Sequence, residues 1–207
     1  MITRRIVIAG LKGGVGKTNT AIGLASTLTK HGHSVIVGDC DTKNKSARFW
    51  ARTGVLPFKV ASEYQLMSIL QKEQFEYLIL DTAAAPTDVE IADLSDGADL
   101  LIAPVIPDGI NLNSLLEFVR KLPAGTNYRV LIQRSPHPPQ TDGESFQVAL
   151  REKNIPVFDR RIRAFKCYAL GSEQGVSAFE VKHDSSGKAW RDWQELSKEF
   201  YEVLNDG

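Results

Sequence analysis

Short runs of consecutive apolar residues recur along the chain, separated by longer stretches whose apolar residues follow helical spacing. The runs are Arg5–Ala9, Ser34–Gly38, Tyr77–Leu80, Leu100–Ala103 and Tyr128–Ile132. Most are rich in β-branched residues or leucine at consecutive positions, which is typical of strands buried on both faces. The pattern therefore predicts a buried strand at each of these positions.

The stretches between the runs predict helices. The segment Thr18–Lys30 places Ile22, Ala25 and Leu28 on one side, and Gly32 follows as a C-terminal stop. Further helices are predicted over Asn44–Arg52, Glu63–Gln71, Thr87–Leu94, Asn113–Leu122 and Glu144–Lys153. Alternation of strand and helix indicates an α/β fold, a doubly wound and mainly parallel sheet with helices on both faces. The length of 207 residues suits a single domain spanning residues 1–207.

A last helix is predicted over Lys188–Leu204, with large apolar side chains at helical spacing. Such a helix either docks on the core or lies on a membrane surface, and the second role requires a dense lysine and arginine face. Here Glu195, Glu199 and Glu202 dilute the basic residues. We therefore expect this helix to dock on the core, with no membrane partner.

Composition narrows the class of protein. The formal net charge is zero, which argues against a chain that grips nucleic acid through bulk positive charge. Cys40 and Cys167 lie far apart and form no CxxC pair, so neither zinc nor an iron–sulfur cluster is expected. No stretch reaches the length of a membrane span. We expect a cytoplasmic protein.

The stretch GLKGGVGKTNT, residues 10–20, follows the first predicted strand and opens the first predicted helix. Its glycines, Gly13, Gly14 and Gly16, allow successive backbone N–H groups to point inward at a phosphate. Lys17 would reach the β- and γ-phosphates, and the Thr18 hydroxyl would bind Mg²⁺. The context therefore predicts a phosphate loop, and with it a P-loop NTPase.

A second lysine, Lys12, precedes the glycines, and Leu11 stands where the usual GxxxxGK[ST] pattern requires glycine. The stretch KGGVGKT resembles the deviant Walker A signature of the ParA/MinD family. The resemblance implies an ATPase of weak intrinsic rate whose early lysine contacts the phosphates of a partner subunit. A cation supplied in trans acts like an arginine finger. The resemblance thus implies a homodimer that forms on ATP binding.

Two later acidic segments extend the resemblance. Gly38-Asp39-Cys40-Asp41 is similar to the switch I segment of the family. The similarity implies that Asp41 orients the attacking water or helps to hold the Mg²⁺ shell, and that Asp39 lies nearer the metal. Either carboxylate alone is also explained as a cap of the following helix. The strand that ends at Asp81 is similar to a Walker B strand, whose acid holds Mg²⁺. The family usually continues DPQ in switch I, and this chain has Thr42-Lys43 instead.

The resemblance also implies a set of binding residues, with ATP and Mg²⁺ as cofactors. Pro107 belongs to a PxxP segment that the family has near the base and the dimer interface. Gln133-Arg134 falls where relatives often carry a polar residue that recognises adenine. Asn19 replaces the usual threonine and is kept as a phosphate ligand. The nucleotide-binding residues are Lys12, Gly13, Gly14, Val15, Gly16, Lys17, Thr18, Asn19, Pro107 and Gln133. The catalytic residues are Lys12, Lys17 and Asp41, and the metal site comprises Thr18, Asp39 and Asp81.

Within the family, the length and the absence of an extension before the first strand resemble the small plasmid-partition ParA type. That type binds DNA non-specifically as an ATP-bound dimer on the nucleoid, and a centromere-binding or cargo adaptor protein stimulates hydrolysis. The basic residues Arg160, Arg161, Arg163 and Lys166 lie near where relatives contact DNA, and would bind phosphates by counterion release. The alternative for this run is a solvated basic edge.

Two other functions stay open at this point. One is a MinD-like positioning ATPase on a membrane. The other is a small-molecule kinase or ligase with the same phosphate loop, such as a dethiobiotin-synthetase-like enzyme, which would not need Lys12 in trans. The sequence does not show whether the cargo is a plasmid, a chromosome or another assembly.

Overall fold

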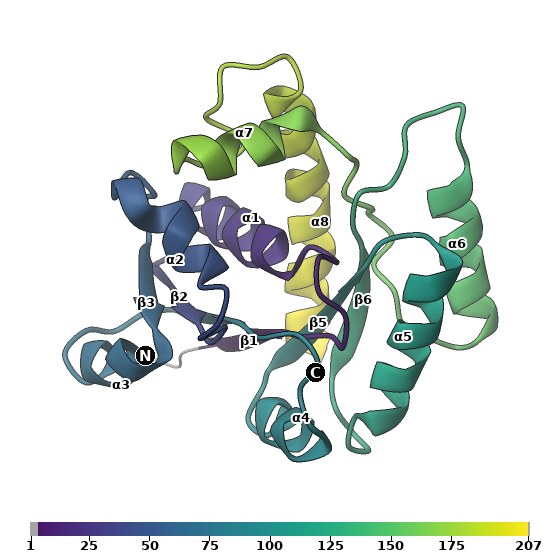
Figure 1. Ribbon diagram of the computed structural model, residues 1–207, viewed down its shortest axis with the longest axis horizontal. Helices are drawn as coiled ribbons and strands as arrows, with labels where there is room; N and C mark the ends of the chain where they lie inside the picture. The colour runs from purple at the N-terminus through teal and green to yellow at the C-terminus, as the bar shows by residue number, and fades with distance from the viewer. Residues whose placement is uncertain (1–3, 207) are drawn as a thin grey trace.

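The computed structural model describes residues 4–206 and is built on a six-stranded parallel sheet with the strand order β3-β2-β4-β1-β5-β6 (Figure 1). The strands are β1 (Arg4–Ile8), β2 (Val35–Asp39), β3 (Lys59–Ser62), β4 (Tyr77–Asp81), β5 (Leu100–Val105) and β6 (Tyr128–Ile132). Strand β1 lies near the middle of the sheet, between β4 and β5. This confirms the predicted α/β fold and its parallel sheet.

Helices cover both faces of the sheet. One side carries α1 (Lys17–Lys30), α2 (Ser46–Trp50), α7 (Lys166–Gln174) and α8 (Ser186–Asp206), with a 3-10 turn, η1 (Ala51–Thr53), after α2. The other side carries α3 (Glu63–Leu70), α4 (Asp88–Ser95), α5 (Gly109–Lys121) and α6 (Asp142–Glu152). Side chains alternate across a strand. Accordingly, Ile6 and Ile8 of β1 join the core under α1 and α8, whereas Val7 joins the core on the opposite face.

The register of the strands positions the site. Ile8 lies opposite Asp81 in the pairing of β1 with β4, and Asp39 lies opposite Asp81 in the pairing of β2 with β4. The carboxyl ends of three adjacent parallel strands therefore meet at one edge of the sheet, where ligands bind in open α/β folds. The loop before α1 leaves β1 at this same edge.

Two elements were not predicted from the sequence, the edge strand β3 and helix α7. Only Ala61 of β3 is buried, and α7 buries only Cys167 and Gly171, so neither segment has a clear apolar pattern. Helix α5 also begins four residues before the predicted start. The Asp108 side chain accepts a hydrogen bond from the Asn111 N–H at 2.7 Å and so caps the helix earlier.

The last helix, α8, docks on the core as predicted. Trp193, Leu196 and Phe200 are almost fully buried and pack in the same core as α1. The apolar face that a membrane anchor would need is therefore occupied by the sheet and α1. Within residues 4–206, no helix is both long enough and apolar enough to cross a bilayer.

The packing of α1 on α8 predicts a strong effect at Gly23. A Cβ atom at this position would lie 2.2 Å from Cζ2 of Trp193, so the indole would have to move within a close-packed core. We expect Gly23→Ala to lower the free energy of unfolding by about 1–3 kcal/mol, measured by urea denaturation.

The matched control is Gly187→Ala in α8, where an added Cβ meets nothing within 4 Å. Alanine is the better helix former, so this variant should be as stable as the wild type or slightly more stable. Equal stability of both variants would contradict the packing argument.

Candidate nucleotide site

The loop between β1 and α1 has the backbone geometry of a phosphate cradle. Gly14 and Gly16 have φ angles of +78° and +99°, a region that favours glycine. Gly16 is the N-cap of α1, and no side chain caps the first amides of that helix. These N–H groups are therefore available to an anion, and the helix dipole adds partial positive charge there.

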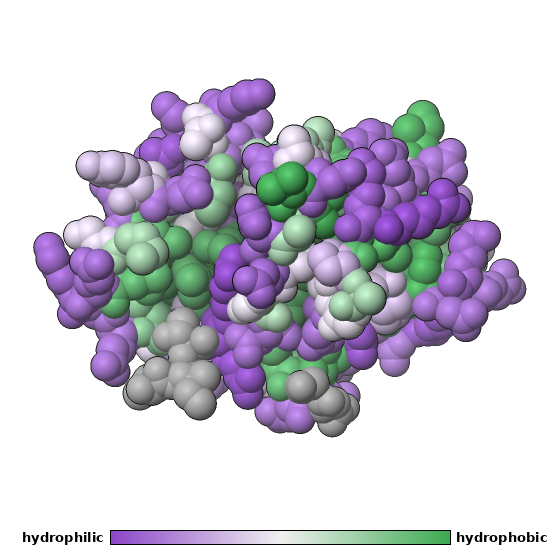
Figure 2. Space-filling view, turned by 90° about the horizontal axis from the view of Figure 1, so that it is seen from below, coloured by the Kyte–Doolittle hydropathy of each residue, from purple (hydrophilic) through white to green (hydrophobic). Residues whose placement is uncertain are grey.

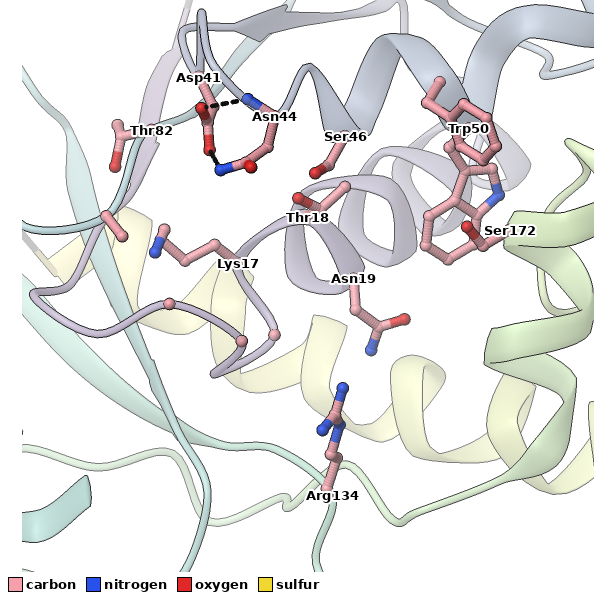
Figure 3. A pocket seen from close by; sticks show the side chains of 15 residues that line it. Lys17, Thr18, Asn19, Asp41, Asn44, Ser46, Trp50, Thr82, Arg134 and Ser172 are labelled. Carbon is pink, nitrogen blue, oxygen red and sulfur yellow. Dashed lines mark hydrogen bonds between the residues drawn. The ribbon is translucent and has the colours of Figure 1, made fainter. Parts of the chain in front are cut away.

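Lys17 is buried and held across the loop. Its Nζ donates a hydrogen bond to the Lys12 carbonyl oxygen at 3.0 Å, and the side chain is only 8% exposed. Burial lowers the pKa of Lys17, while the nearby carboxylates of Asp81 and Asp41 act in the opposite direction. Figure 3 shows Lys17 and Thr18 bordering the same space as Asp41. Lys17 is thus already positioned to meet bound phosphates.

Thr18 and Asp81 form the part of the site that fits a divalent cation. Thr18 Oγ1 donates to Asp81 Oδ2 at 2.7 Å, and Asp81 Oδ1 is buried without a hydrogen-bond partner. The pKa of Asp81 is raised to about 7, mainly by burial; the bond from Thr18 acts in the opposite direction, and the charge of Asp39 adds to the rise. An orphaned carboxylate oxygen beside a hydroxyl suits Mg²⁺, which takes few protein ligands and completes its shell with phosphate and water. In residues 4–206 no cluster of three or more histidine, cysteine, aspartate or glutamate side chains is arranged to hold a metal unaided.

Asp39 and Asp41 both accept hydrogen bonds from backbone N–H groups. Asp39 Oδ2 accepts from the Arg48 N–H at 2.9 Å in the first turn of α2. Asp41 accepts from the Asn44 backbone and side chain, at 2.9 and 2.8 Å, and from the Lys43 N–H at 3.1 Å. Burial would raise the pKa of Asp41, but these bonds and the charge of Lys17 outweigh it and lower the pKa. Asp39 therefore caps α2, as the alternative raised from the sequence has it, whereas Asp41 closes a turn that ends before α2 begins at Ser46.

Gln133 does not present a free amide to the site. It is fully buried, its Oε1 accepts from Asn19 Nδ2 at 3.1 Å, and its Nε2 donates to Thr20 Oγ1 at 2.8 Å. The side chain also packs against Gly16, where an added Cβ would lie 3.1 Å from its Cγ. Gln133 therefore supports the phosphate loop, and it lines a neighbouring cavity together with Asn19 and Arg134.

A cavity of about 520 Å³ continues from the phosphate loop toward α2 and α7 (Figure 3). The predicted site residues that line it are Gly13, Gly14, Gly16, Lys17, Thr18, Asn19 and Asp41. Lys12, Val15, Pro107 and Gln133 are not in its lining. Arg134, which the resemblance placed beside Gln133 near the base, also lines the cavity. Residues that sequence reasoning did not assign to the site complete it: Asn44, Ser46, Phe49, Trp50, Thr82, Ala84 and Ser172.

The missed residues come together only through tertiary contacts. Trp50 Nε1 donates to the Val176 carbonyl at 2.8 Å, and Thr53 Oγ1 donates to the Gly175 carbonyl at 2.8 Å. These bonds join the end of α2 to the end of α7 and close the far side of the cavity. The sequence indicated these residues only through the helical pattern over Asn44–Arg52, and that pattern does not show which part of the protein the helix faces.

The predicted DNA-binding arginines are engaged with carboxylates. Arg160 and Arg163 both pair with Asp192 of α8, whose side chain is fully buried, with the Arg163 Nη2 at 2.6 Å. Arg161 Nη2 donates to Glu144 Oε1 at 2.8 Å. Lys166 is exposed, and its side chain has no hydrogen bond or ion pair among residues 4–206. Much of the positive charge of this segment is therefore neutralised locally.

The comparison with known families decides the assignment. Residues 6–175 match the family described as the CobQ/CobB/MinD/ParA nucleotide binding domain. The chain belongs to this family. Within it, the chain is a ParA/MinD-type positioning ATPase, as the resemblance of the phosphate loop implied.

Individual relatives and solved structures are similar to the chain over nearly its whole length. The chain is 32% identical over 206 residues to the maintenance of carboxysome distribution protein A of Gloeobacter kilaueensis, covering 95% of this chain and 94% of the relative. The septum site-determining protein MinD of Pyrococcus horikoshii, complexed with Mg-ADP, superimposes with a TM-score of 0.71 at 16% identity, covering 98% of this chain and 99% of MinD. An ATP complex of a McdA variant from Cyanothece gives a TM-score of 0.67 at 22% identity, covering 95% and 96%. At these identities the two structures support the fold alone.

The raised pKa of Asp81 predicts a pH-dependent stability of the ligand-free protein. Between its unfolded pKa near 3.8 and its folded pKa of about 7, the folded state keeps a proton that the unfolded state has lost, so stability falls as pH rises through this range. Asp81→Asn removes the titrating group. We expect the stability of the variant relative to wild type to increase from pH 5 to pH 8, by about 1.4 kcal/mol for each pH unit between pH 5 and the folded pKa of about 7.

The measurement is urea denaturation at both pH values without nucleotide or divalent cation. Asp184→Asn, at an exposed aspartate, is the control and should follow the wild type. Parallel pH profiles of wild type and Asp81→Asn would show that Asp81 is not the group responsible.

Proposed function

We propose that this chain is an ATP-driven switch that dimerises on binding ATP with Mg²⁺, binds DNA non-specifically, and positions a cargo. A partner protein that stimulates hydrolysis resets it. The observation that carries the proposal is the separation of two lysines in one loop. Lys17 is buried in the cavity of its own chain, whereas Lys12 is outside that lining and its side chain has no hydrogen bond or ion pair within residues 4–206.

The residues of the cavity have distinct tasks in this proposal. The amides of the loop and of the first turn of α1 hold the phosphates, and Lys17 neutralises charge at the transferring group. Thr18 and Asp81 would hold Mg²⁺, with Asp39 next to Asp81 in the outer shell. When bound, the ion would neutralise charge on the β- and γ-phosphates. Lys12 serves the phosphates of the other subunit, which makes hydrolysis depend on dimerisation.

Asp41 is the residue proposed to orient the attacking water. Its lowered pKa keeps it ionised near neutral pH, and it lies close enough to Lys17 for their charges to interact. A carboxylate has about four acceptor positions, and three are occupied here by Asn44 and Lys43. One position is therefore left for a water molecule. The turn that these bonds close holds the carboxylate in place.

The cargo is proposed from the relatives. The relative that spans nearly the whole chain is named for carboxysome distribution. Two relatives matched over about half of the chain are the chromosome-partitioning ATPase Soj of Thermus thermophilus and the protein ParA of Rhizobium radiobacter. A large protein assembly is accordingly the first cargo to test, and plasmid or chromosomal DNA is the second.

If Lys12 acts on the partner subunit, its replacement should abolish ATP-dependent dimerisation without weakening ATP binding. We expect Lys12→Ala and Lys12→Gln to bind ATP as wild type but to lose ATP-dependent dimerisation and the rise in turnover with protein concentration. Removal of a cation acting in trans should lower stimulated turnover by about a thousandfold. Sedimentation velocity with ATP and Mg²⁺ measures the first effect, and phosphate release the second.

Lys17→Ala is the matched control in the same loop and should lose ATP binding itself. If both Lys12 variants dimerise and turn over ATP as wild type does, the in-trans role is wrong. If turnover instead rises with an added small metabolite, the protein is a small-molecule kinase or ligase.

Substitutions in the basic segment 160–166 should affect DNA binding or stability, depending on whether the residue already has a partner within the chain. Lys166 has no intramolecular partner, so Lys166→Ala should weaken ATP-dependent binding to random-sequence duplex, reduce the salt slope by about 1 per bound chain, and leave stability unchanged. Arg163→Ala removes a partner of the buried Asp192 and should lower the free energy of unfolding by about 1–3 kcal/mol. Fluorescence anisotropy over a salt series and urea denaturation measure the two effects.

Equal DNA affinity of wild type and Lys166→Ala at all salt concentrations would contradict contact at this lysine. Equal affinity of the ATP-bound and nucleotide-free forms would contradict a switch.

A further inference from the structure

One arginine joins the carboxyl ends of two helices beside the nucleotide cavity. Arg52, in η1 directly after α2, donates from Nη1 to the Phe49 carbonyl of α2 at 2.7 Å and to the Ser172 carbonyl of α7 at 2.9 Å. Its Nη2 donates to the Glu173 carbonyl, also in α7. The last carbonyls of a helix lack regular helical partners, and a cation there also interacts favourably with the helix dipole. Arg52 therefore serves two helix ends at once.

Two neighbouring side chains extend this junction. Trp50 Nε1 donates to the Val176 carbonyl and Thr53 Oγ1 donates to the Gly175 carbonyl, both at 2.8 Å. A Cβ atom at Gly175 would lie 2.5 Å from Thr53 Oγ1, and Gly175 has a φ of +69°, so glycine suits this close approach. We call Trp50, Arg52, Thr53 and the carbonyls that they bind the α2–α7 clasp.

The α2–α7 clasp stands beside the space for the nucleotide. Trp50 and Ser172 line the cavity of about 520 Å³ that begins at the phosphate loop, and they also line a neighbouring cavity of about 560 Å³. Figure 3 shows both side chains at the end of the first cavity that lies away from Lys17. A nucleotide whose phosphates bind at Lys17 would therefore place its ribose and base beside this wall, whichever of the two cavities they enter.

The end of α7 is held against α2 mainly by the bonds of the clasp. Trp50 packs in the main core and keeps α2 in place, whereas α7 buries only Cys167 and Gly171. Arg52 is exposed, and its guanidinium lies 4.0 Å from the ring centre of Phe49, a residue that lines the cavity and is 57% exposed. Hydrogen bonds that water can reach open at a lower cost than those of a core. The clasp can therefore open while the sheet and the phosphate loop stay in place.

The charge of Arg52 is not used elsewhere. Among residues 4–206 it forms no ion pair with a carboxylate, and the groups that accept hydrogen bonds from its guanidinium are backbone carbonyls. A guanidinium presents several N–H donors in a rigid plane, whereas the ammonium of lysine is a single compact charge. Joining the carbonyls of two helices at once therefore requires arginine.

The clasp lies apart from the apolar surface at the opposite end of the molecule. Helix α7 is at the top of Figure 1, and α2 lies beside its left end. Figure 2 shows the molecule from below, where hydrophilic residues surround an apolar hollow left of centre. A substitution in the clasp therefore leaves that surface unchanged.

We propose that Arg52 is a positioning residue of the nucleotide cavity, and that opening of the α2–α7 clasp is the step that lets a nucleotide leave. The clasp holds the wall beside the ribose and base, whereas the phosphate loop, Lys17 and Thr18 hold the phosphates independently of it. This assignment rests on the proposed function only in taking ATP as the ligand of the cavity. Dimerisation, DNA binding and cargo do not enter it.

The test compares a ligand that has a nucleoside with one that has only phosphates. Calorimetry with Mg²⁺ measures the affinity of the full-length wild type and of Arg52→Ala for ADP and for inorganic pyrophosphate, and stopped flow measures the release of fluorescently labelled ADP. Loss of the carbonyl contacts should speed release and weaken ADP binding by at least about tenfold. Pyrophosphate should bind both proteins equally. In steady-state assays the KM for ATP should rise without a fall in kcat, because the groups at the phosphates are unchanged.

Arg120→Ala is the matched control, with the same change in net charge. Arg120, on α5, is exposed, and its side chain has no hydrogen bond or ion pair in the described part of the chain. This variant should bind and release ADP as wild type does. Arg52→Lys keeps the charge but cannot bind the same set of carbonyls, so its release rate should lie between those of wild type and Arg52→Ala. Urea denaturation confirms that each variant is folded.

Three results would overturn the proposal. Release of ADP from Arg52→Ala at the wild-type rate would show that the clasp does not retain the nucleotide. Equal losses of pyrophosphate and ADP affinity would show that the whole site has loosened, and not the wall beside the nucleoside. Wild-type behaviour of Arg52→Lys would show that the planar guanidinium is not required. A wild type that binds no ADP would refute the proposed function as well, whereas normal ADP binding with unchanged release in Arg52→Ala refutes the clasp alone.

Discussion

The hydrogen bond from Thr18 Oγ1 to Asp81 Oδ2 joins the start of α1 to the end of β4, and the geometry of the site depends on it. Helix α1 cannot shift relative to the sheet without breaking this bond, so the phosphate loop is fixed in front of the carboxyl ends of the strands. The bond also leaves Asp81 with a buried oxygen that has no partner. A bound cation would remove the free-energy cost of burying that oxygen without a partner, so folding and ligand binding would act on the same group.

The other polar groups around the cavity have partners that a ligand must replace or preserve. Lys17 donates to the backbone of its own loop, Asp39 caps α2, and Asp41 closes a turn with Asn44. Each bond is local and can be exchanged without unfolding an element. Asp39 binds the first turn of α2, and Trp50 at the end of α2 binds the Val176 carbonyl just after α7. A movement of Asp39 would therefore be transmitted through α2 to the far wall of the cavity. Such exchange is what a two-state switch requires.

The buried Asp192 has a comparable role on the other side of the molecule. It binds Arg160 and Arg163, and it is fully buried, so this pair of arginines is primarily a device that fastens the segment before α7 to α8. A buried charge left without its partners is costly, which constrains these positions independently of any nucleic acid. Lys166, which begins α7, is the member of the basic run that is free to act outward.

The sequence by itself determined the parallel α/β sheet, the positions of its central strands, the phosphate loop and the acid that ends β4. These features rest on local patterns, namely consecutive apolar residues, and glycines, a lysine and a hydroxyl at fixed spacing between a strand and a helix. Only the tertiary structure decided that Gln133 supports the loop, that the arginines bind Asp192, and that Trp50 and Ser172 close the cavity. Each of these contacts joins residues that are far apart in the chain. The sequence shows that a side chain can form a hydrogen bond, but not which distant group the fold will bring within reach of it. For the same reason, the edge strand β3 and helix α7 could not be predicted, since both are held by contacts with neighbouring elements more than by an apolar pattern of their own.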